Sequence, residues 1–434
     1  MRKLDVSIEI NGRMREVGSI VGENEYNAGF TYSMDYLASE TARPISIALP
    51  LREETFGPLE TGIFFEGLLP EGFLRRKISE NNRADSNDYL ALLEMLGGEC
   101  LGAVQIKGEG FVAVEPEYRE LSPEYMMEIA AEGASKSADL VVESHLSLTG
   151  ASGKIGAYRD KDARWFLPVG SAPSTHIVKQ SHIRYNHIVQ NEQLAMKTAE
   201  LLGIEVPRTI IVNTGGKKQD GANETSISRN LLFAAERYDR TMKGSETVIS
   251  GLPAPRRLHQ EDFCQALGIP SADKYEHAGG GYMKRLFDLL AERSASPIED
   301  QMKLWDIISF HYMIGNTDGH IKNLSLLYDS NLRSVRLAPA YDIVSTIIYD
   351  KHSSEMAFSI GGETEWSSLG RENFAKAAAE IGLNKRILME RFDKMSENFD
   401  SALVRAADEL TDLGYEEVKE IAEKIRLMKK QQGS

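Results

Sequence analysis

The stretch IGNTDGHIKNLSLLYD, residues 314–329, ends an apolar helical pattern and gathers small polar and reactive side chains in a loop. Asp318, His320, Lys322 and Asn323 are its candidates for chemistry, and four residues separate Asp318 from Asn323. In phosphoryl transfer of the protein-kinase kind, an Asp accepts the proton of the attacking hydroxyl, and an Asn at this spacing holds a metal ion on the nucleotide phosphates. The same spacing also fits an ordinary Asn/Asp/Gly turn. The surrounding segments therefore have to decide between these two interpretations.

A second carboxylate follows in RLAPAYDIVST, residues 336–346, where Asp342 comes after an apolar segment marked by a proline. A short hairpin, LSLLYDS followed by SVRLAP, would fold Asp342 back onto the loop that holds Asn323. An Asp and an Asn together would suit a metal ion on nucleotide phosphates. Taken alone, Asp342 is better explained as a turn residue.

A lysine and a glutamate upstream occur in the order that kinases use. Lys179 lies in the apolar, strand-like segment THIVKQ, and Glu192 begins the next helical pattern. A strand Lys paired with a helix Glu orients the ammonium that contacts the phosphates. A solvated lysine on an edge strand is about equally consistent with the segment on its own.

Two further segments fit a nucleotide site. In SLTGASGK, residues 147–154, small side chains would let backbone N–H groups approach phosphate oxygens. Its spacing is neither that of a Walker A loop nor that of a dinucleotide-binding loop, and a flexible hairpin turn is the alternative. The strand FAAERYDR, residues 233–240, could offer backbone groups to an adenine ring, although a core strand with a charged end is the commoner explanation.

Composition and charge limit the class of protein. The chain has 434 residues, of which 42% are hydrophobic and 26% charged, as in soluble globular proteins of more than one domain. The net charge of -15 opposes direct binding to nucleic acid or anionic lipid. Only Cys100 and Cys264 are present, so we expect a reducing compartment and buried thiols. With no signal-peptide or membrane-spanning pattern, we expect a cytoplasmic protein without membrane contact.

Apolar periodicity predicts an α+β chain with a β-rich first part and a helical second part. Alternation around Asn11-Gly12 predicts a hairpin at the N-terminus, and a helical pattern follows Asp85. We predict an α+β subdomain over residues 1–140, a β-rich nucleotide-binding part over 141–255, and an all-helical C-terminal lobe over 256–434. Together these segments predict a two-lobed, protein-kinase-like fold.

The ordered segments resemble the HipA-type serine/threonine kinases, which are toxins of toxin-antitoxin modules, over nearly the whole chain. The stretches that carry the resemblance are ARPISIALPL, SLTGASGK, STHIVK, NEQLAMKTAELLGIEVP, ERYDR, EDFCQALGIPSADKYE, GNTDGHIKNLSL and LAPAYDIVS. The resemblance implies that Asp318 is the catalytic base, that Asn323 and Asp342 are magnesium ligands, and that Ser147 is autophosphorylated, which inactivates the enzyme. It implies nucleotide contacts by Thr149, Gly150, Ala151, Ser152, Gly153, Lys154, Lys179, Glu236, Arg237, Tyr238, His320, Lys322, Asn323, Tyr341 and Asp342.

The same resemblance implies ATP and Mg²⁺ as cofactors and a HipB-like helix-turn-helix antitoxin as partner. Operator DNA would then be bound mainly by the antitoxin, in agreement with the negative charge of this chain. The substrate would be a protein, and glutamate-tRNA ligase is the best-known target in the family. The chain departs from the family at Ser152 and Gly153, where Gln and Glu are often found, and in the short segment between Lys179 and Glu192.

Two other functions remain open at this point. One is a kinase of small molecules or lipids, because a two-lobed site does not dictate a protein acceptor. The other is a catalytically idle nucleotide-binding corepressor that acts with the antitoxin. Retention of Asp318, Asn323 and Asp342 argues against the idle scaffold, since it would need none of them for chemistry.

Overall fold

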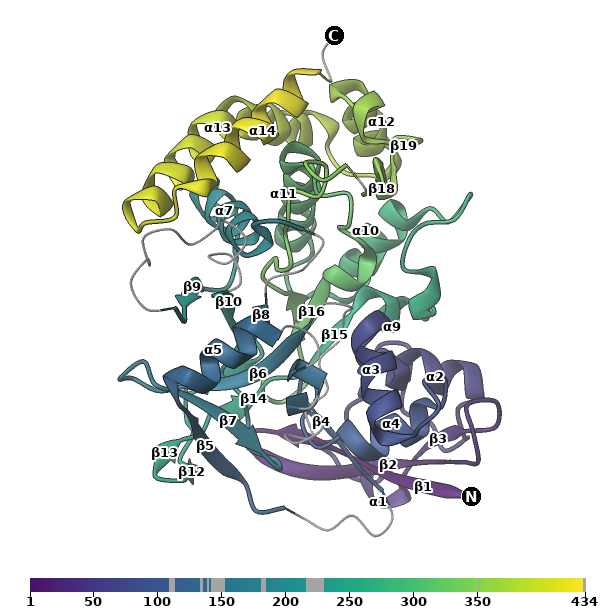
Figure 1. Cartoon of the computed structure of the whole chain (residues 1–434). Coiled ribbons are helices and arrows are strands. Elements are labelled where there is room, and N and C mark those ends of the chain that lie inside the picture. Colours follow the sequence, from purple (N-terminus) through teal and green to yellow (C-terminus); the bar gives the residue numbers. More distant parts are fainter. Residues whose placement is uncertain are drawn as a thin grey trace. The chain divides into compact units, whose positions relative to one another are not determined.

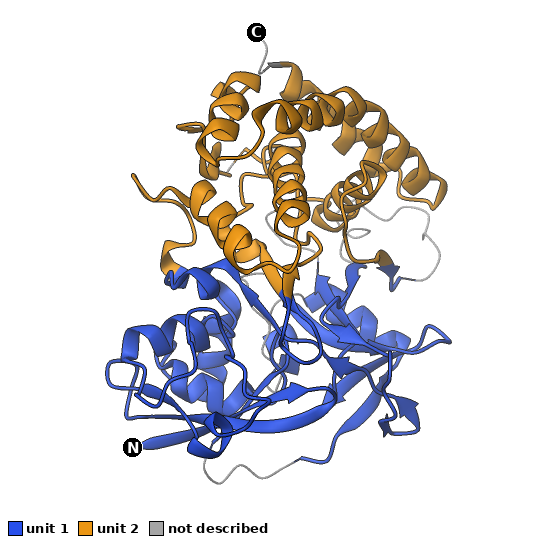
Figure 2. Cartoon of the chain, turned by 180° about the vertical axis from the view of Figure 1, so that it is seen from behind, with its two compact units in different colours: residues 1–182, 212–271, 327–334 blue, residues 183–211, 272–326, 335–434 orange. Residues whose placement is uncertain are grey.

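A computed structural model describes residues 1–108, 114–132, 136–138, 140–141, 153–180, 185–215, 230–350 and 352–431. The chain forms two compact units, coloured separately in Figure 2. Unit 1 comprises residues 1–182, 212–271 and 327–334, and unit 2 comprises residues 183–211, 272–326 and 335–434. The predicted domain boundaries at residues 140 and 255 do not coincide with these units, because contacts group segments that are distant in the sequence.

The first sheet of unit 1 begins with the hairpin that Asn11-Gly12 predicts. Asn11 and Gly12 have φ values of 51° and 76°, as a type I′ turn requires. The strands are antiparallel in the order β3-β2-β1-β4, with bounds β1 (Arg2–Ile10), β2 (Arg13–Gly22), β3 (Gly29–Tyr32) and β4 (Val104–Gly108). The helices between β3 and β4 are α1 (Met34–Leu37), α2 (Pro58–Glu66), α3 (Gly72–Asn82) and α4 (Tyr89–Leu96) (Figure 1).

The second sheet has the strand order β5-β7-β6-β8-β10-β9. Its strands are β5 (Glu117–Leu121), β6 (Lys154–Arg159), β7 (Trp165–Val169), β8 (His176–Gln180), β9 (Thr209–Asn213) and β10 (Leu231–Glu236), and α5 (Pro123–Glu132) follows β5. The strands predicted in THIVKQ and FAAERYDR are present as β8 and β10. The aromatic side chains of Tyr118, Tyr158 and Phe166 form a buried cluster on this sheet.

Short strands and helices follow β10 between residues 240 and 273. Two small ladders pair β11 with β14 and β12 with β13. The bounds are β11 (Arg240–Thr241), β12 (Val248–Ile249), β13 (Leu252–Pro253), β14 (Arg256–Arg257), β15 (Gln260–Asp262), α9 (Phe263–Leu267) and η1 (Ser271–Asp273).

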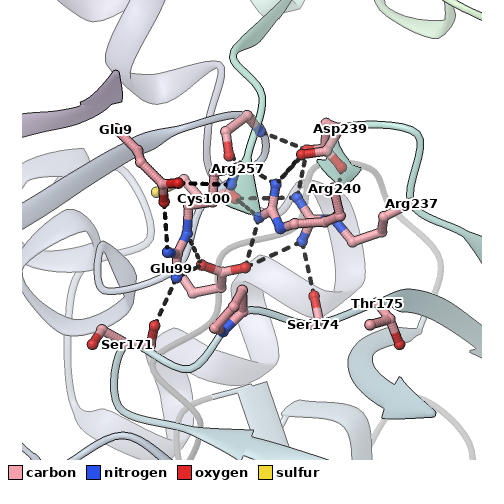
Figure 3. Close-up of polar contacts among 12 residues, drawn as sticks. Glu9, Glu99, Cys100, Ser171, Ser174, Thr175, Arg237, Asp239, Arg240 and Arg257 are labelled. Carbon is pink, nitrogen blue, oxygen red and sulfur yellow. Dashed lines mark hydrogen bonds and ion pairs between the residues drawn. The ribbon is translucent and has the colours of Figure 1, made fainter. Parts of the chain in front are cut away.

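A buried ion network joins the N-terminal part of unit 1 to its middle part. Its six members are at most 9% exposed and carry three positive and three negative charges (Figure 3); they are Glu9, Glu99, Arg237, Asp239, Arg240 and Arg257. Glu99 lies 2.6 Å from both Arg240 and Arg257, and Arg257 also pairs with Glu9 at 3.2 Å. Such pairs are stable in the interior only when every charge is compensated. The network therefore joins residues on both sides of position 140.

Unit 2 is mainly helical, and α13 packs against α7, α11, α12 and α14. The helices are α7 (Ile188–Leu201), α10 (Tyr282–Arg293), α11 (Pro297–Ile314), η2 (Ile321–Asn323), η3 (Trp366–Ser368), α12 (Arg371–Glu380), α13 (Lys385–Asp412) and α14 (Glu417–Gln431). The second half of the chain also contains the strands β16 (Ser325–Tyr328), β17 (Val335–Leu337), β18 (Glu355–Ile360) and β19 (Glu363–Glu365). β16 and β17 are the hairpin predicted before Asp342, whereas the description of this half as all-helical overlooked β18 and β19, whose short apolar runs carry little periodic signal.

Both cysteines are buried free thiols, as predicted. Burial raises the pKa of Cys100 to about 12, which keeps this thiol protonated. Over the residues that the structure describes, no helix combines the length and the hydropathy needed to cross a membrane.

Candidate active site

The loop after α11 begins at Gly315, which adopts φ of 70°. A Cβ atom at this position would lie 2.3 Å from Cγ2 of Ile347, so both the backbone conformation and the packing require glycine. The Gly315 carbonyl accepts a hydrogen bond of 2.9 Å from the backbone N–H of Thr346. The start of the loop is thereby tied to the segment that follows Asp342.

Threonine hydroxyl groups add further hydrogen bonds between this loop and the segment that follows Asp342. The Thr317 N–H donates to Oγ1 of Thr346 at 2.8 Å, and the Thr317 hydroxyl donates to the carbonyl of Ser353 at 2.9 Å. Asn316 accepts a hydrogen bond from the Asp318 N–H through Oδ1 at 3.1 Å. The backbone on the N-terminal side of Asp318 is therefore held by side chains from within unit 2.

Gly319 packs against a buried histidine of α11. A Cβ atom at Gly319 would lie 2.1 Å from Nδ1 of His311, so glycine is required for the loop to approach the helix. Burial, together with the neighbouring His320, lowers the pKa of His311 to about 4. The neutral imidazole thus acts as a packing surface under the loop.

Asp318 and Asn323 are joined directly. The Asn323 side chain donates a 3.0 Å hydrogen bond from Nδ2 to the carbonyl of Asp318. This contact spans η2 and directs the amide nitrogen to the backbone, which leaves the amide oxygen as the atom of Asn323 that could bind a metal. His320 and Lys322, also predicted to contact nucleotide, are both 6% exposed in the same loop.

The structure also brings Asp342 to this loop. The Tyr341 hydroxyl donates to the carbonyl of Lys322 at 2.9 Å and contacts the hydroxyl of Ser325 at 2.7 Å. Asp342 itself has φ of 56°, an uncommon conformation for a residue with a Cβ atom and one concentrated at functional sites. The hairpin return predicted for Asp342 is therefore observed, through β16 and β17.

The oxygen atoms of Asn323 and Asp342 form a donor set that fits Mg²⁺. Magnesium on a nucleotide takes one or two protein oxygen ligands and completes its octahedron with phosphate oxygens and water. No group of three or more His, Cys, Asp and Glu side chains suitable for a metal occurs among the described residues.

Helix α7 is held to the segment after Asp342 by an asparagine. Asn191 is fully buried, and its side chain accepts from the Ser345 N–H at 3.0 Å and donates to the Ser345 carbonyl at 2.9 Å. Glu192 is the next residue of α7 and is 4% exposed. Glu192, Asp318, Asn323 and Asp342 therefore all belong to unit 2.

Unit 1 carries the predicted lysines on neighbouring strands. Lys154 in β6 lies directly opposite Lys179 in β8, and Lys179 lies opposite Phe233 in β10. The Lys179 ammonium is 5.5 Å from the centre of the Phe233 ring. The two lysines thus place two positive charges at facing positions of neighbouring strands. The predicted pairing of Lys179 with Glu192 joins residues of different units and stays a prediction.

The segment Glu236–Tyr238, predicted to contact adenine, lies at the end of β10. Glu236 is exposed at the end of β10, and the Tyr238 hydroxyl donates to Gln260. The Arg237 side chain is buried, with its guanidinium bonded to Asp239 and to Ser174. The Arg237 guanidinium thus belongs to the ion network, and the contact of this segment's backbone with an adenine ring stays a prediction.

Part of the predicted phosphate loop lies outside the described residues, namely Ser147, Thr149, Gly150, Ala151 and Ser152. Gly153 and Lys154 are described, and the Gly153 carbonyl accepts from the Gln180 N–H at 3.3 Å. The roles of the residues before Gly153 stay predictions.

A cavity of about 970 Å³ in unit 2 opens beside Asp318. Its wall includes Tyr185, Tyr275, Glu276, His352 and Glu355. Tyr275 donates a hydrogen bond to Oδ1 of Asp318. Sequence patterns assigned no role to Tyr275 or to Asn191, since neither is marked by a local motif and both act through contacts distant in the sequence.

The chain combines a β-rich part that carries two facing lysines with a helical part that carries a D-x-x-x-x-N loop and, after a hairpin, a second Asp. This combination defines the protein-kinase-like class of fold. Residues 8–107 match the family model of the HipA N-terminal domain, and residues 146–403 match that of the HipA-like C-terminal domain. The chain therefore belongs to the HipA family.

Individual relatives cover nearly the whole chain. A protein of Sinorhizobium fredii named "Putative kinase Y4mE" is 31% identical over 92% of this chain and 91% of its own. The "Serine/threonine-protein kinase toxin HipA" of Shewanella oneidensis is 25% identical over 93% of this chain and 90% of its own. A solved complex of Shewanella oneidensis HipA with HipB and operator DNA contains a chain of the same fold, with a TM-score of 0.79 and 23% identity over 99% of this chain and 96% of that one.

Proposed function

We propose that this protein is an ATP- and Mg²⁺-dependent serine/threonine protein kinase of the HipA type. The observation that carries the proposal is a pair of hydrogen bonds within unit 2, which attach the Asn323 side chain and the residue before Asp342 to the loop of Asp318. The Asn323 side chain donates to the backbone carbonyl of Asp318, and the Tyr341 hydroxyl donates to the carbonyl of Lys322, which ties the residue preceding Asp342 to the same loop. An inactive scaffold would have no chemical reason to keep this arrangement.

In the proposed reaction, Asp318 accepts the proton of a serine or threonine hydroxyl as the hydroxyl oxygen attacks the γ-phosphorus of ATP. The new O–P bond forms while the bond between the γ-phosphorus and the bridging oxygen breaks, and ADP leaves. Asn323 and Asp342 hold Mg²⁺, which neutralises charge on the phosphates. The facing lysines 154 and 179 supply the cationic surface for those phosphates, and Glu192 orients Lys179.

Two finer features belong to the same proposal. Ser147 is an autophosphorylation site, as the resemblance to the family implies, and its modification switches the enzyme off. A HipB-like antitoxin is the partner and carries operator DNA, which agrees with the net charge of -15 on this chain. The HipA–HipB–DNA composition of the solved complex supports this partner. The substrate is a protein, for which an aminoacyl-tRNA synthetase such as glutamate-tRNA ligase is the first candidate, and the site of action is the cytoplasm.

The test is to incubate the purified full chain with Mg²⁺ and ATP and to record intact and peptide masses. Asp318→Asn is the matched variant, because it keeps the shape of the side chain and removes its basicity. We expect phosphate on Ser147 in the wild type and none in the variant, with equal ATP affinity by calorimetry. ATP binding without phosphate gain in either protein, even with a synthetase added, would favour the corepressor function, and transfer that persists in Asp318→Asn would disprove the assigned base.

A further inference from the structure

The side chain of Tyr275 occupies the face of Asp318 that a substrate would need. Tyr275 lies between η1 and α10, and its hydroxyl donates a hydrogen bond to Oδ1 of Asp318. A general base must accept a hydrogen bond from the hydroxyl group whose proton it removes. In this structure the hydroxyl in that position belongs to the protein itself.

The backbone next to Tyr275 is firmly attached to β18. The Glu276 N–H donates to the Ala357 carbonyl at 2.8 Å. The Glu276 carboxylate accepts from the Ser359 N–H at 2.6 Å and from the Tyr282 N–H at 2.9 Å. Three hydrogen bonds thus fix the loop, so the placement of Tyr275 at Asp318 is built into the fold of unit 2.

The Tyr275 side chain, in contrast, has room to leave. It is 41% exposed and lines the 970 Å³ cavity together with Asp318. Its ring meets His320 edge-on, with ring centres 5.2 Å apart. Rotation about the Cα–Cβ bond would move the hydroxyl away from Asp318 without breaking the three Glu276 hydrogen bonds.

We propose that Tyr275 is an internal stand-in for the acceptor, and that the cavity beside Asp318 is where the acceptor hydroxyl binds. Rotation of Tyr275 replaces its hydroxyl on Asp318 with that of a serine or threonine, and no covalent bond changes in this exchange. While Tyr275 is in place, water is kept from Asp318 and bound ATP is protected from hydrolysis. This inference rests on the proposed kinase function and adds the position of its acceptor site.

The test compares the wild type with Tyr275→Phe, which keeps the ring and removes only the competing hydroxyl. Tyr282→Phe is the matched control, because it removes a hydroxyl that donates to the Asp273 carbonyl in the same loop and does not touch Asp318. Two rates are measured with Mg²⁺ and ATP: ADP formation without acceptor, and phosphate transfer at increasing concentrations of myelin basic protein as a general serine/threonine acceptor. We expect Tyr275→Phe to raise acceptor-free ADP formation about tenfold, as for release of a hydrogen bond to a charged group, and to lower KM for the acceptor with kcat unchanged.

A wild-type rate of ADP formation in Tyr275→Phe would refute the stand-in role while leaving the kinase function intact. A reduced kcat with unchanged KM would also refute it, because Tyr275 would then position Asp318 for catalysis. Absence of both ADP formation and phosphate transfer in all three proteins would instead refute the proposed function, and the acceptor site with it.

Discussion

Replacing Glu99 with glutamine tests whether the buried ion network holds unit 1 together. Glu99 is 1% exposed and faces three guanidinium groups, with distances of 2.6 Å to Arg240, 2.6 Å to Arg257 and 3.6 Å to Arg237. Burial alone would raise the pKa of Glu99, but Arg240, Arg257 and Arg237 outweigh it and hold that pKa below its usual range. Glutamine keeps the size of the side chain and leaves one uncompensated positive charge in the interior.

Removing one partner of a buried ion pair typically costs about 3–5 kcal/mol. For a domain of this size, each kcal/mol shifts the midpoint of thermal unfolding by about 2–4 °C. We therefore expect Glu99→Gln to lower the first unfolding transition in calorimetry by on the order of 10 °C. The matched control is Asp393→Asn, which removes the carboxylate from an Arg371 pair whose side chains are 61% and 38% exposed.

The exposed pair should contribute less than about 1 kcal/mol, so Asp393→Asn should unfold within a few degrees of the wild type. If Glu99→Gln unfolds at the temperature of this control, the network does not stabilise unit 1 and the reasoning fails. The pH dependence of stability under acidic conditions gives a second measurement. The pKa of Glu99 is depressed and that of Asp239 is lowered to about 2, so their contribution is complete above about pH 4.5 and is lost as the pH falls towards 2.

Three further predictions concern single side chains. Burial raises the pKa of Glu261 to about 7. The contribution of this side chain to stability is therefore present below about pH 4.5 and is lost as the pH rises through 7. Glu261→Gln should gain thermal stability relative to the wild type between pH 5 and 8, and parallel melting profiles of the two proteins would contradict this. Gly319→Ala places a Cβ atom 2.1 Å from Nδ1 of His311. It should lower the rate of phosphate transfer about 100-fold, because the loop is displaced. In the control Gly370→Ala, the added Cβ atom has open space around it, and the rate should be unchanged. Lys179→Met should weaken ATP binding in calorimetry about 10- to 100-fold, as for loss of a charge-assisted hydrogen bond; unchanged affinity would remove this lysine from the phosphate site.

Local sequence patterns predicted the secondary structure well where it depends on residues only a few positions apart. The Asn11-Gly12 turn, helix α7 and the long helices α10, α11, α13 and α14 were all expected from periodicity and turn residues. These features depend on neighbours one to four positions apart, so they are visible in the sequence itself. Strands β18 and β19 were missed, because a short ladder stabilised by its surroundings has no distinctive period.

The candidate site was predicted in its residue types and order more than in its contacts. Asp318 and Asn323 share one loop, and their spacing indicated kinase chemistry only together with the surrounding segments. The hairpin return of Asp342 was predicted, but the bond from the Tyr341 hydroxyl to the Lys322 carbonyl became visible only in the tertiary structure. The pairing of the Arg237 side chain with Glu99 was not predicted, because nothing near Arg237 in the sequence reveals so distant a partner.

The sequence by itself determined the α+β class, the order of β-rich and helical parts, and the acid–amide loop, since these follow from hydrophobic periodicity and from fixed spacings along the chain. Only the tertiary structure decided that Glu99 neutralises three arginines, that Asn191 attaches α7 to Ser345, and that Tyr275 covers Asp318. Each of these contacts joins residues separated by some 40 to 160 positions. Whether such groups meet depends on how whole elements pack, and packing is a collective property of the folded chain that no local pattern encodes.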